Sequence, residues 1–333
     1  MSLANKHRPA TFEDVCGQNN NVAILKHMIE TDCIPAAMGF FGASGCGKTT
    51  LARICAYLIN KGKGHPIEQD AASNNSVDDV RQIIENAKQR SLDSEYKIFI
   101  IDEAHAITSQ GWQAFLKLLE EPNRFTKFIF CTTNPEKIPD TVISRLQTFT
   151  FSKLSDDLII SRLRHISDIE QFDISDESLS YIARVSNGSM RQSITNLEKC
   201  AARGSTISYD TVIETVGTAD YNIFTNLYSA IYANDARRAI KLVEGVYSSG
   251  KDIRTFVFEF LKFMLDLTKA NMFDKDLSLT TLPNTTEICA LFSYSDKFKS
   301  TLDNLVEFYE DNKLNSDIRF ILEAKLISWC SQV

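Results

Sequence analysis

The chain has 333 residues, of which 44% are hydrophobic and 24% charged, and its formal net charge is −7 at pH 7. This length and apolar content suffice for two or three domains with sizeable cores, while neither half is a basic block, which rules out an argument for nucleic-acid binding from net charge. No apolar run reaches the roughly 18 residues that span a bilayer and the N-terminus has no apolar signal core, so we expect a soluble, cytoplasmic protein without a membrane partner.

The first 37 residues predict a loop and then an amphipathic helix that ends before Pro35. The apolar side chains of this helix recur at helical spacing, at Val22, Ile24, Leu25, Met28 and Ile29. A helix of this kind packs on a core and by itself indicates no function.

A glycine-rich stretch, Gly42–Thr49, joins an apolar run at 38–41 to helix-forming residues at 50–59. A strand, a glycine-rich turn and a helix start are the context of a phosphate-binding loop, because glycines let backbone N–H groups close around phosphate oxygens. In such a loop Lys48 reaches the β- and γ-phosphates and the Thr49 hydroxyl ligates Mg²⁺. The stretch therefore predicts binding of a nucleoside triphosphate.

Eight cysteines are scattered without a Cys-x-x-Cys pair, which indicates reduced thiols and no zinc site. Cys46 differs from the others because it lies at the expected start of the helix after the glycine-rich loop. A helix N-terminus lowers thiol pKa values, so we expect a reactive Cys46 that bound nucleotide protects from alkylation.

A turn-rich segment at 61–66 and a loop at 70–75 come next. Ser76 is expected to cap the following helix, with Asp79 as its capping-box partner. From the residues alone this helix is either an ordinary surface helix or part of a functional surface. Its single apolar face consists of Val77, Val80, Ile83, Ile84 and Ala87.

An apolar run at 98–101 predicts a buried parallel strand, with Asp102 and Glu103 at its carboxyl end. Open α/β sheets bind their ligands at this end of the strands. One carboxylate can hold Mg²⁺ through water while the next orients the attacking water. Together with the glycine-rich loop, this pair predicts hydrolysis of the bound nucleotide.

The alternation of strands and helices continues to residue 151. A helix is expected over 109–121, with Trp112 assigned to the core rather than to a contact surface. A buried strand over 127–134 ends in Thr133 and Asn134, whose side chains are placed to reach the γ-phosphate. With a further strand at 148–151, the pattern predicts a parallel sheet covered by helices.

From residue 153 onward the pattern predicts helices only, with Ser155 and Ser175 as N-caps. The stretch 256–267 is apolar nearly all round, which indicates burial in a bundle or between subunits. We expect three domains, at 1–154, 155–217 and 218–333.

These segments together resemble the AAA+ ATPase subunits of DNA-polymerase sliding-clamp loaders, most closely the gamma/tau subunit of bacterial loaders. The resemblance implies a RecA-like parallel sheet over 1–154, a helical lid over 155–217 and an all-α oligomerising collar over 218–333. The shared motifs, in the family's order, are Arg8-Pro9-x-x-Phe12, Asp14-Val15-x-Gly17-Gln18, Gly42–Thr49, Asp70–Ser73, Ile101–His105, Leu118–Pro122, Thr132–Pro135, Ile143–Arg145 and Gly188–Arg191.

The resemblance also implies ATP and Mg²⁺ as cofactors. It makes Asp102, together with Thr49, the Mg²⁺ site and Glu103 the catalytic base. Thr133 or Asn134 then corresponds to sensor 1, and Arg191 to sensor 2 on the lid. The adenine pocket is expected within 8–18. The nucleotide-binding residues are expected to be Arg8, Val15, Gln18, Gly42, Ala43, Ser44, Gly45, Cys46, Gly47, Lys48, Thr49 and Thr50.

Partners follow from the same resemblance. Arg145 is expected to act as an arginine finger on ATP bound by the neighbouring subunit, which makes hydrolysis depend on assembly. The expected partners are the sliding clamp, contacted by residues 107–115, the other clamp-loader subunits and primer–template DNA. The subunits would form a pentameric ring with several copies of this chain. The expected contacts with DNA phosphates are Ser73, Asn74, Asn75 and Ser76.

Three departures from the family pattern stand out. Between Cys55 and Asp70 there is no room for the four-cysteine zinc insert of the bacterial subunit. Leu146 follows Arg145 where the family usually has a cysteine, and residues 73–76 lack the basic residue common near that point. A compact, zinc-free chain suits a phage-encoded or streamlined loader, and we expect it in the cytoplasm of a bacterial cell or a phage-infected host.

Three other functions compete with this reading. The letters Asp-Glu-Ala-His also mark a helicase class, but nothing here resembles the second RecA-like domain that such helicases need. Another AAA+ DNA-remodelling ATPase, of the branch-migration type, is a second possibility. A non-hydrolysing clamp-loader scaffold is a third, and the presence of Lys48, Thr49, Asp102 and Glu103 argues against it.

Overall fold

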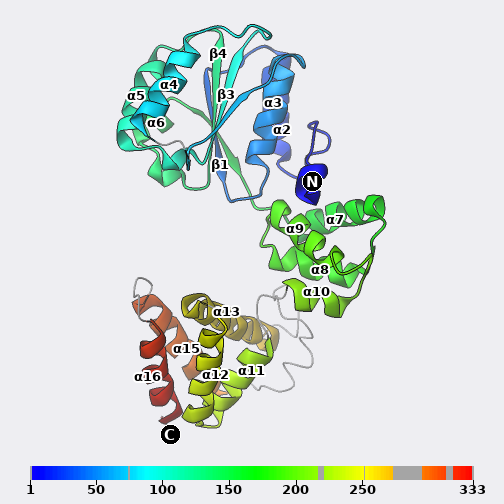
Figure 1. Cartoon of the computed structure of the whole chain (residues 1–333), viewed down its shortest axis with the longest axis vertical. Helices are drawn as coiled ribbons and strands as arrows, with labels where there is room; N and C mark the ends of the chain where they lie inside the picture. Colours follow the sequence, from blue (N-terminus) through cyan, green and yellow to red (C-terminus); the bar gives the residue numbers. More distant parts are fainter. Residues whose placement is uncertain are drawn as a thin grey trace. The chain divides into compact units, whose positions relative to one another are not determined.

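The computed structural model describes residues 2–73, 76–216, 221–250, 252–272, 295–312 and 318–331. The chain divides into two compact units, Met1–Ser208 and Tyr209–Val333. The first unit contains the parallel sheet and a group of helices that follows it, and the second is built from helices (Figure 1).

A five-stranded parallel sheet forms the centre of the first unit, with strand order β2-β3-β4-β1-β5. The expected apolar runs form the three inner strands, which are buried because helices cover both faces. The strands are β1 (Ala37–Gly42), β2 (Ile67–Asp70), β3 (Lys97–Asp102), β4 (Thr126–Thr132) and β5 (Gln147–Phe151).

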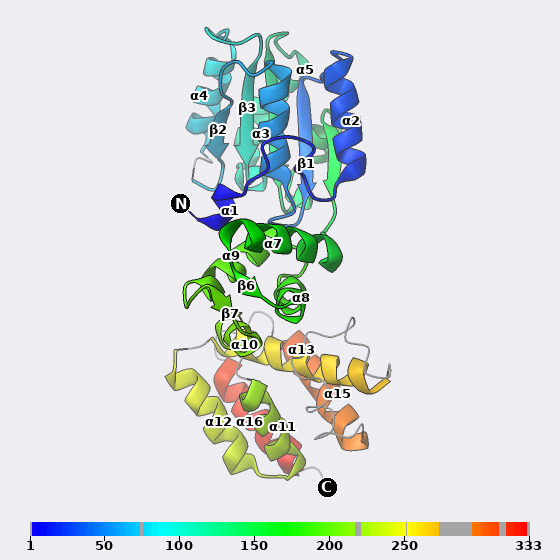
Figure 2. The ribbon, with the colours of Figure 1, turned by 90° about the vertical axis from the view of Figure 1, so that its right-hand side faces the viewer.

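Helices cover the two faces of the sheet as separate sets. On one face α2 (Asn19–Glu30) and α3 (Lys48–Ile59) pack on side chains such as Phe40 and Ile100. On the other face α4 (Val77–Ala87), α5 (Ser109–Glu120) and α6 (Asp140–Ile143) pack on neighbours in the same strands, such as Phe99 and Phe130. Alternating strand residues therefore belong to two different cores. The ribbon shows helices on both faces of the sheet (Figures 1 and 2).

The expected Trp112 core position and the Ser76 cap are confirmed. Trp112 is 1% exposed and packs against Phe115 and Phe130. Ser76 and Asp79 form the complete capping box at the start of α4. Leu146, which follows Arg145, is buried in the same core as Trp112.

A helical lid, made of α7 (Asp156–Glu170), α8 (Asp176–Val185) and α9 (Met190–Ala201), follows the sheet. The expectation of helices only is wrong here, because β6 (Asp173–Ile174) and β7 (Thr206–Ile207) pair as a two-stranded parallel sheet. Ser155 and Ser175 both stand at N-caps, and the Ser175 side chain accepts the capping hydrogen bond from Ser178 N. A short N-terminal helix, α1 (Leu3–Lys6), lies against α9 (Figure 2).

The second unit has its own hydrophobic core, built from all of its longer helices. α13 (Ile253–Met272) buries Phe256, Phe260, Phe263 and Met264 in this core, whereas Phe258 on the same helix is 49% exposed. The described helices are α10 (Tyr209–Val216), α11 (Tyr221–Tyr232), α12 (Ala236–Ser248), α13 (Ile253–Met272), α15 (Asp296–Asp311) and α16 (Ile318–Ser331).

The division between the units falls at 208/209, so α10 groups with the second unit, whereas the expected lid extended to residue 217. Residues 217–220 lie outside the described part of the chain, and the division into three domains stays a prediction. No helix in the described ranges combines the length and the apolar character that crossing a membrane requires.

Candidate nucleotide-binding site

The glycine-rich stretch forms the turn between β1 and α3, at the carboxyl end of an inner strand of the sheet. Gly47, the N-cap of α3, has a φ of 107°, and nothing lies within 4 Å of the place where a Cβ would stand. Gly45 has a φ of 75°, and a Cβ there would meet Ser189 Oγ at 2.0 Å. Both positions require glycine, one for its backbone conformation alone and the other also for the close approach of the lid.

Lys48 is folded into the loop that it belongs to. Lys48 is 6% exposed, and its Nζ donates to the carbonyl oxygens of Gly42 at 2.7 Å and Ala43 at 2.8 Å. The ammonium group is thus held at the centre of the loop beside the N-terminus of α3. A positive charge at a helix N-terminus is the arrangement that attracts phosphate oxygens.

Thr49 lies in the first turn of α3 and meets Asp102, the last residue of β3. Thr49 Oγ1 donates to Asp102 Oδ2 at 2.8 Å, and Glu103 N donates to Asp102 Oδ1 at 3.0 Å. A hydroxyl and a carboxylate are the hard oxygen donors that Mg²⁺ takes alongside waters and substrate phosphates, so this pair fits the ion. Within the described residues no group of three or more His, Cys, Asp and Glu side chains could hold a metal without such a substrate.

Glu103 follows β3 with a left-handed backbone, at a φ of 49°. Its Oε2 accepts from Thr133 Oγ1 at 3.3 Å and lies 3.3 Å from His105 Nδ1. Thr133 Oγ1 also lies 2.8 Å from Asn134 Oδ1, so its single proton is shared between the two acceptors. The structure therefore brings the two sensor 1 candidates to the carboxylate, with Thr133 in direct contact. His105, which no sequence pattern singled out for this role, is a second neighbour of the carboxylate.

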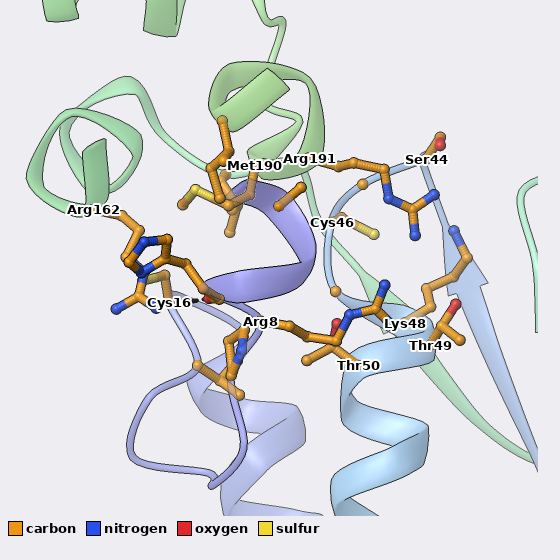
Figure 3. A pocket seen from close by; sticks show the side chains of 18 of the residues that line it. Arg8, Cys16, Ser44, Cys46, Lys48, Thr49, Thr50, Arg162, Met190 and Arg191 are labelled. Carbon is orange, nitrogen blue, oxygen red and sulfur yellow. Dashed lines mark hydrogen bonds between the residues drawn. The ribbon is translucent and has the colours of Figure 1, made fainter. Parts of the chain in front are cut away.

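A cavity opens between the glycine-rich loop and the lid, with Asp102 and Glu103 in its lining. Figure 3 shows Arg8 and Arg191 reaching toward Lys48 from different sides. Part of the wall is apolar, including Val15, and suits a base rather than a phosphate. The residues of that apolar wall are Val15, Leu154, Met190 and Ile194.

The lid contacts the loop directly, because Met190 N donates to Gly45 O at 3.1 Å. This contact places Arg191, at the start of α9, over the loop and in the cavity lining. Arg162 of α7 also lines the cavity and donates to His7 O at 3.0 Å. Sequence reasoning missed Arg162, and no local pattern could have found it, because only the packing of α7 brings it here.

The remaining expected nucleotide contacts divide into two groups. Ser44–Thr50 line the cavity, whereas Gly42 and Ala43 take part through the carbonyl groups that hold Lys48. Gln18 is not in the lining. Its Nε2 donates to Ser152 O at 2.7 Å and to Cys46 O at 3.4 Å, so it stabilises the loop from outside the cavity. Direct binding of nucleotide by Gln18 stays a prediction.

Arg145 lies after α6, outside the cavity lining. Its guanidinium forms an ion pair with Glu120 at 2.6 Å and donates to Thr141 O at 2.5 Å. Glu120 ends α5 and belongs to the Leu118–Pro122 motif. Through this ion pair it orients Arg145, which belongs to the Ile143–Arg145 motif. A finger that serves a neighbouring subunit has to lie away from its own nucleotide, and this placement is compatible with that role.

The expectation of a low pKa for Cys46 is wrong. Cys46 is 2% exposed, and burial raises the pKa of its thiol despite the nearby Lys48 and the helix N-terminus. Its Sγ lies 2.9 Å from Ala43 O, which is an acceptor and offers no stabilisation to a thiolate. Desolvation of the charged form outweighs the favourable charges.

The structure describes only the ends of the expected DNA-contact loop. Ser73 is exposed, the Ser76 hydroxyl is engaged with Asp79, and Asn74 and Asn75 lie outside the described residues. Asp78 and Asp79 occupy the first turn of α4, where negative side chains oppose phosphate binding. DNA contact at this loop stays a prediction.

Clamp contact by the segment 107–115 stays a prediction, and the apolar side chains of this segment are buried. Ile107 is 6% exposed, and Trp112 and Phe115 are almost completely buried. Replacing Ile107 and Trp112 by alanine would therefore damage the core rather than a surface. Any contact made by this segment has to use its exposed residues, such as Gln110 and Gln113.

Comparisons with known proteins agree with the geometry of the site. A family model described as DNA polymerase III, delta subunit, matches residues 60–155, and one described as DNA polymerase III subunits gamma and tau domain III matches residues 207–300. The DNA polymerase III subunit gamma/tau of Mycoplasma genitalium is 33% identical over 285 residues, covering 79% of this chain and 48% of the relative. The subunit tau of Bacillus subtilis is 30% identical over 289 residues, covering 80% and 51%.

The chain belongs to the DNA polymerase III gamma/tau family. It spans about half the length of the curated members of the family that it matches. Among solved structures, the RuvB Holliday junction branch migration motor of Thermotoga maritima matches with a TM-score of 0.55 and 18% identity, over 67% of this chain and 79% of that one. At this identity the likeness shows the AAA+ fold alone.

Proposed function

We propose that this chain is an ATP-driven subunit of a sliding-clamp loader, which opens the ring clamp and loads it onto primer–template DNA during replication. One observation carries the proposal. Lys48, the Thr49–Asp102 pair and Glu103 meet at one cavity, while Arg145 lies outside its lining. A complete set of hydrolytic residues without its finger is what a site at a subunit interface contains before assembly.

The residues suit hydrolysis of ATP to ADP and phosphate. Lys48 and the loop N–H groups bind the β- and γ-phosphates, and Thr49 and Asp102 would hold Mg²⁺, which offsets the charge that develops on the phosphate oxygens. Glu103 orients a water toward the γ-phosphorus and accepts its proton. A bond then forms between that oxygen and phosphorus as the bond to the β-phosphate oxygen breaks. Thr133 keeps the carboxylate oriented through its 3.3 Å hydrogen bond.

Arg145 would complete the site of the neighbouring subunit. Its guanidinium stabilises negative charge in the transition state, and fingers of this kind contribute roughly 10³- to 10⁵-fold in rate. The isolated chain should therefore hydrolyse ATP slowly. This dependence on assembly requires other loader subunits, several of them copies of this chain, together with the clamp and DNA as partners.

The test is the ATPase rate of the wild type and of Arg145→Ala, with and without primer–template DNA, sliding clamp and candidate partner subunits. We expect strong stimulation by DNA and clamp that is lost in the variant, although the variant still binds ATP. Arg124→Ala, an exposed arginine in the loop before β4, is the matched control and should behave as the wild type.

Two other results would count against the proposal. Stimulation by DNA alone, independent of Arg145 and clamp, would indicate a different AAA+ motor. Absence of hydrolysis under every condition would indicate a scaffold subunit. The likeness to RuvB does not favour the first of these, because it extends to the fold alone.

A further inference from the structure

Residues 2–9 form an N-terminal strap that is fastened to the lid. Leu3 is buried and its N donates to Glu198 Oε1 of α9 at 3.1 Å. Glu170 at the end of α7 binds Lys6 at 2.7 Å and His7 at 2.5 Å. Because Arg162 of α7 also holds His7 O, the strap is tied to two helices of the lid.

Arg8 is the residue through which the strap enters the cavity. Its side chain lines the cavity, and in Figure 3 it extends toward Lys48 and Thr50. Its Nη2 donates to Asn5 Oδ1 at 3.0 Å, and this neutral amide oxygen orients the guanidinium without neutralising it. Across the described ranges of the chain, no carboxylate lies within ion-pair distance of Arg8.

Around Arg8 the cationic groups outweigh the carboxylates, which favours an anion site over a base pocket. Burial lowers the pKa of Arg8, and the nearby guanidinium groups of Arg53 and Arg191 lower it further, whereas the carboxylates of Glu68 and Asp102 act in the opposite direction with smaller effect. Arg53 is neutralised by Glu68 at 2.5 Å. Lys48 of the loop itself and Arg191 of the lid line the same cavity as Arg8. Gathering like charges in a partly buried cavity is unfavourable unless a polyanion binds between them.

We infer that Arg8 binds the terminal phosphate of the nucleoside triphosphate and, together with Arg191, clamps that phosphate from the lid side. This inference rests on the proposed function and changes the role expected for Arg8, because the apolar wall with Val15 suffices for adenine. Since the strap is fastened to the lid, both arginines belong to one body. ATP would then hold the lid and its strap against the loop through two cations, and ADP would release both.

Binding of MgATP and MgADP, measured by titration calorimetry on the full chain, tests the inference. We expect Arg8→Gln to weaken ATP binding by about 10- to 100-fold, the range of a lost charge-assisted hydrogen bond, while ADP affinity changes less than about threefold. Arg8→Lys keeps the charge and should recover part of the loss for ATP. Lys6→Gln, on the same strap but outside the cavity, is the matched control and should leave both affinities unchanged.

Each other result overturns the inference. Equal losses for ATP and ADP would place Arg8 at the base or at the inner phosphates, and no loss for either would remove it from the site. An effect of Lys6→Gln as large as that of Arg8→Gln would assign the loss to detachment of the strap. If Arg8→Gln unfolds at a lower temperature than the wild type without nucleotide, the ATP and ADP affinities of Arg8→Lys are used to test the inference instead. Failure of the wild type to bind ATP at all would overturn the proposed function together with the inference.

Discussion

Lys48 and Thr49 have different roles in this site, because their side-chain polar atoms have different partners. Thr49 and Lys48 are adjacent in sequence, yet the Thr49 hydroxyl faces Asp102 while the Lys48 ammonium is held by loop carbonyl groups. The methyl group of Thr49 plays no part in ligating an ion. A serine at this position should therefore keep the function of the threonine, whereas a valine, which has no hydroxyl, should not.

We expect Thr49→Val to lower the rate of Mg²⁺-dependent ATP hydrolysis in the assembled loader by about 10²- to 10³-fold, the usual effect of removing one well-placed polar group from a transition state. Thr49→Ser should stay within a few-fold of the wild type. The measurement is the steady-state ATPase rate over a range of MgCl₂ concentrations. Equal activity of the two variants would show that the hydroxyl is no ligand.

Cys46 gives a pH prediction with a definite sign. Because burial raises the pKa of its thiol, the folded protein binds this proton more tightly than the unfolded chain does. Its contribution to the free energy of unfolding is complete below the unfolded thiol pKa and is lost as pH rises above it. We expect Cys46 to react with iodoacetamide more slowly than exposed Cys33 at pH 8, as read by peptide mass spectrometry. A faster rate at Cys46 would restore the low pKa first expected.

At the scale of elements, α4 depends on its capping box. Ser76 Oγ accepts from Asp79 N at 3.2 Å, and Asp79 Oδ2 accepts from Ser76 N at 3.1 Å. Ser76→Ala removes the first of these bonds and should lower the free energy of unfolding by about 1 kcal/mol. Urea denaturation measures the loss, with exposed Ser73→Ala as the control. An unchanged urea midpoint in Ser76→Ala would mean that α4 forms without its cap.

Elements with a strong local signal were predictable from sequence. β3 and β4 are continuous apolar runs, and the helices α2 and α5 have clear apolar periodicity. β2 was missed because its residues, Ile-Glu-Gln-Asp, are mostly polar, as an edge strand allows. β6 and β7 were missed because each has two residues, which is too short for an alternating apolar pattern to be recognised.

The loop, the acids and Arg191 of the candidate site were recognisable as motifs, and the structure brings them to one cavity. The approach of Arg162 and His7 was not recognisable, because it results from the packing of α7 against the strap. Burial of Cys46 is likewise a property of the fold. Its position at a helix start was visible in the sequence, whereas the desolvation that controls its pKa was not.

For the whole molecule, two units with separate cores predict a local response to nucleotide. ATP at 100 times its dissociation constant stabilises the unit that binds it by about 2.7 kcal/mol. Hydrogen exchange of the monomeric chain should therefore show added protection within residues 2–208 and none within 209–331. Lys48→Ala should abolish the effect. Protection that spreads into the second unit would show that the two units unfold together.

The strand order also dictates when the nucleotide loop can form during synthesis. Among the strands that the structure describes, the neighbours of β1 are β4 and β5, so Met38 lies beside Ile129 and Gln147, which the ribosome adds much later. At about 5–20 residues per second, the interval between Gly42 and Gln147 is roughly 5–20 s. The loop is thus translated early, but β1 has both of its neighbouring strands only after β5 has been added. A nascent chain that ends before Phe151 should be unable to retain ATP, and throughout that interval it exposes an apolar strand to chaperones.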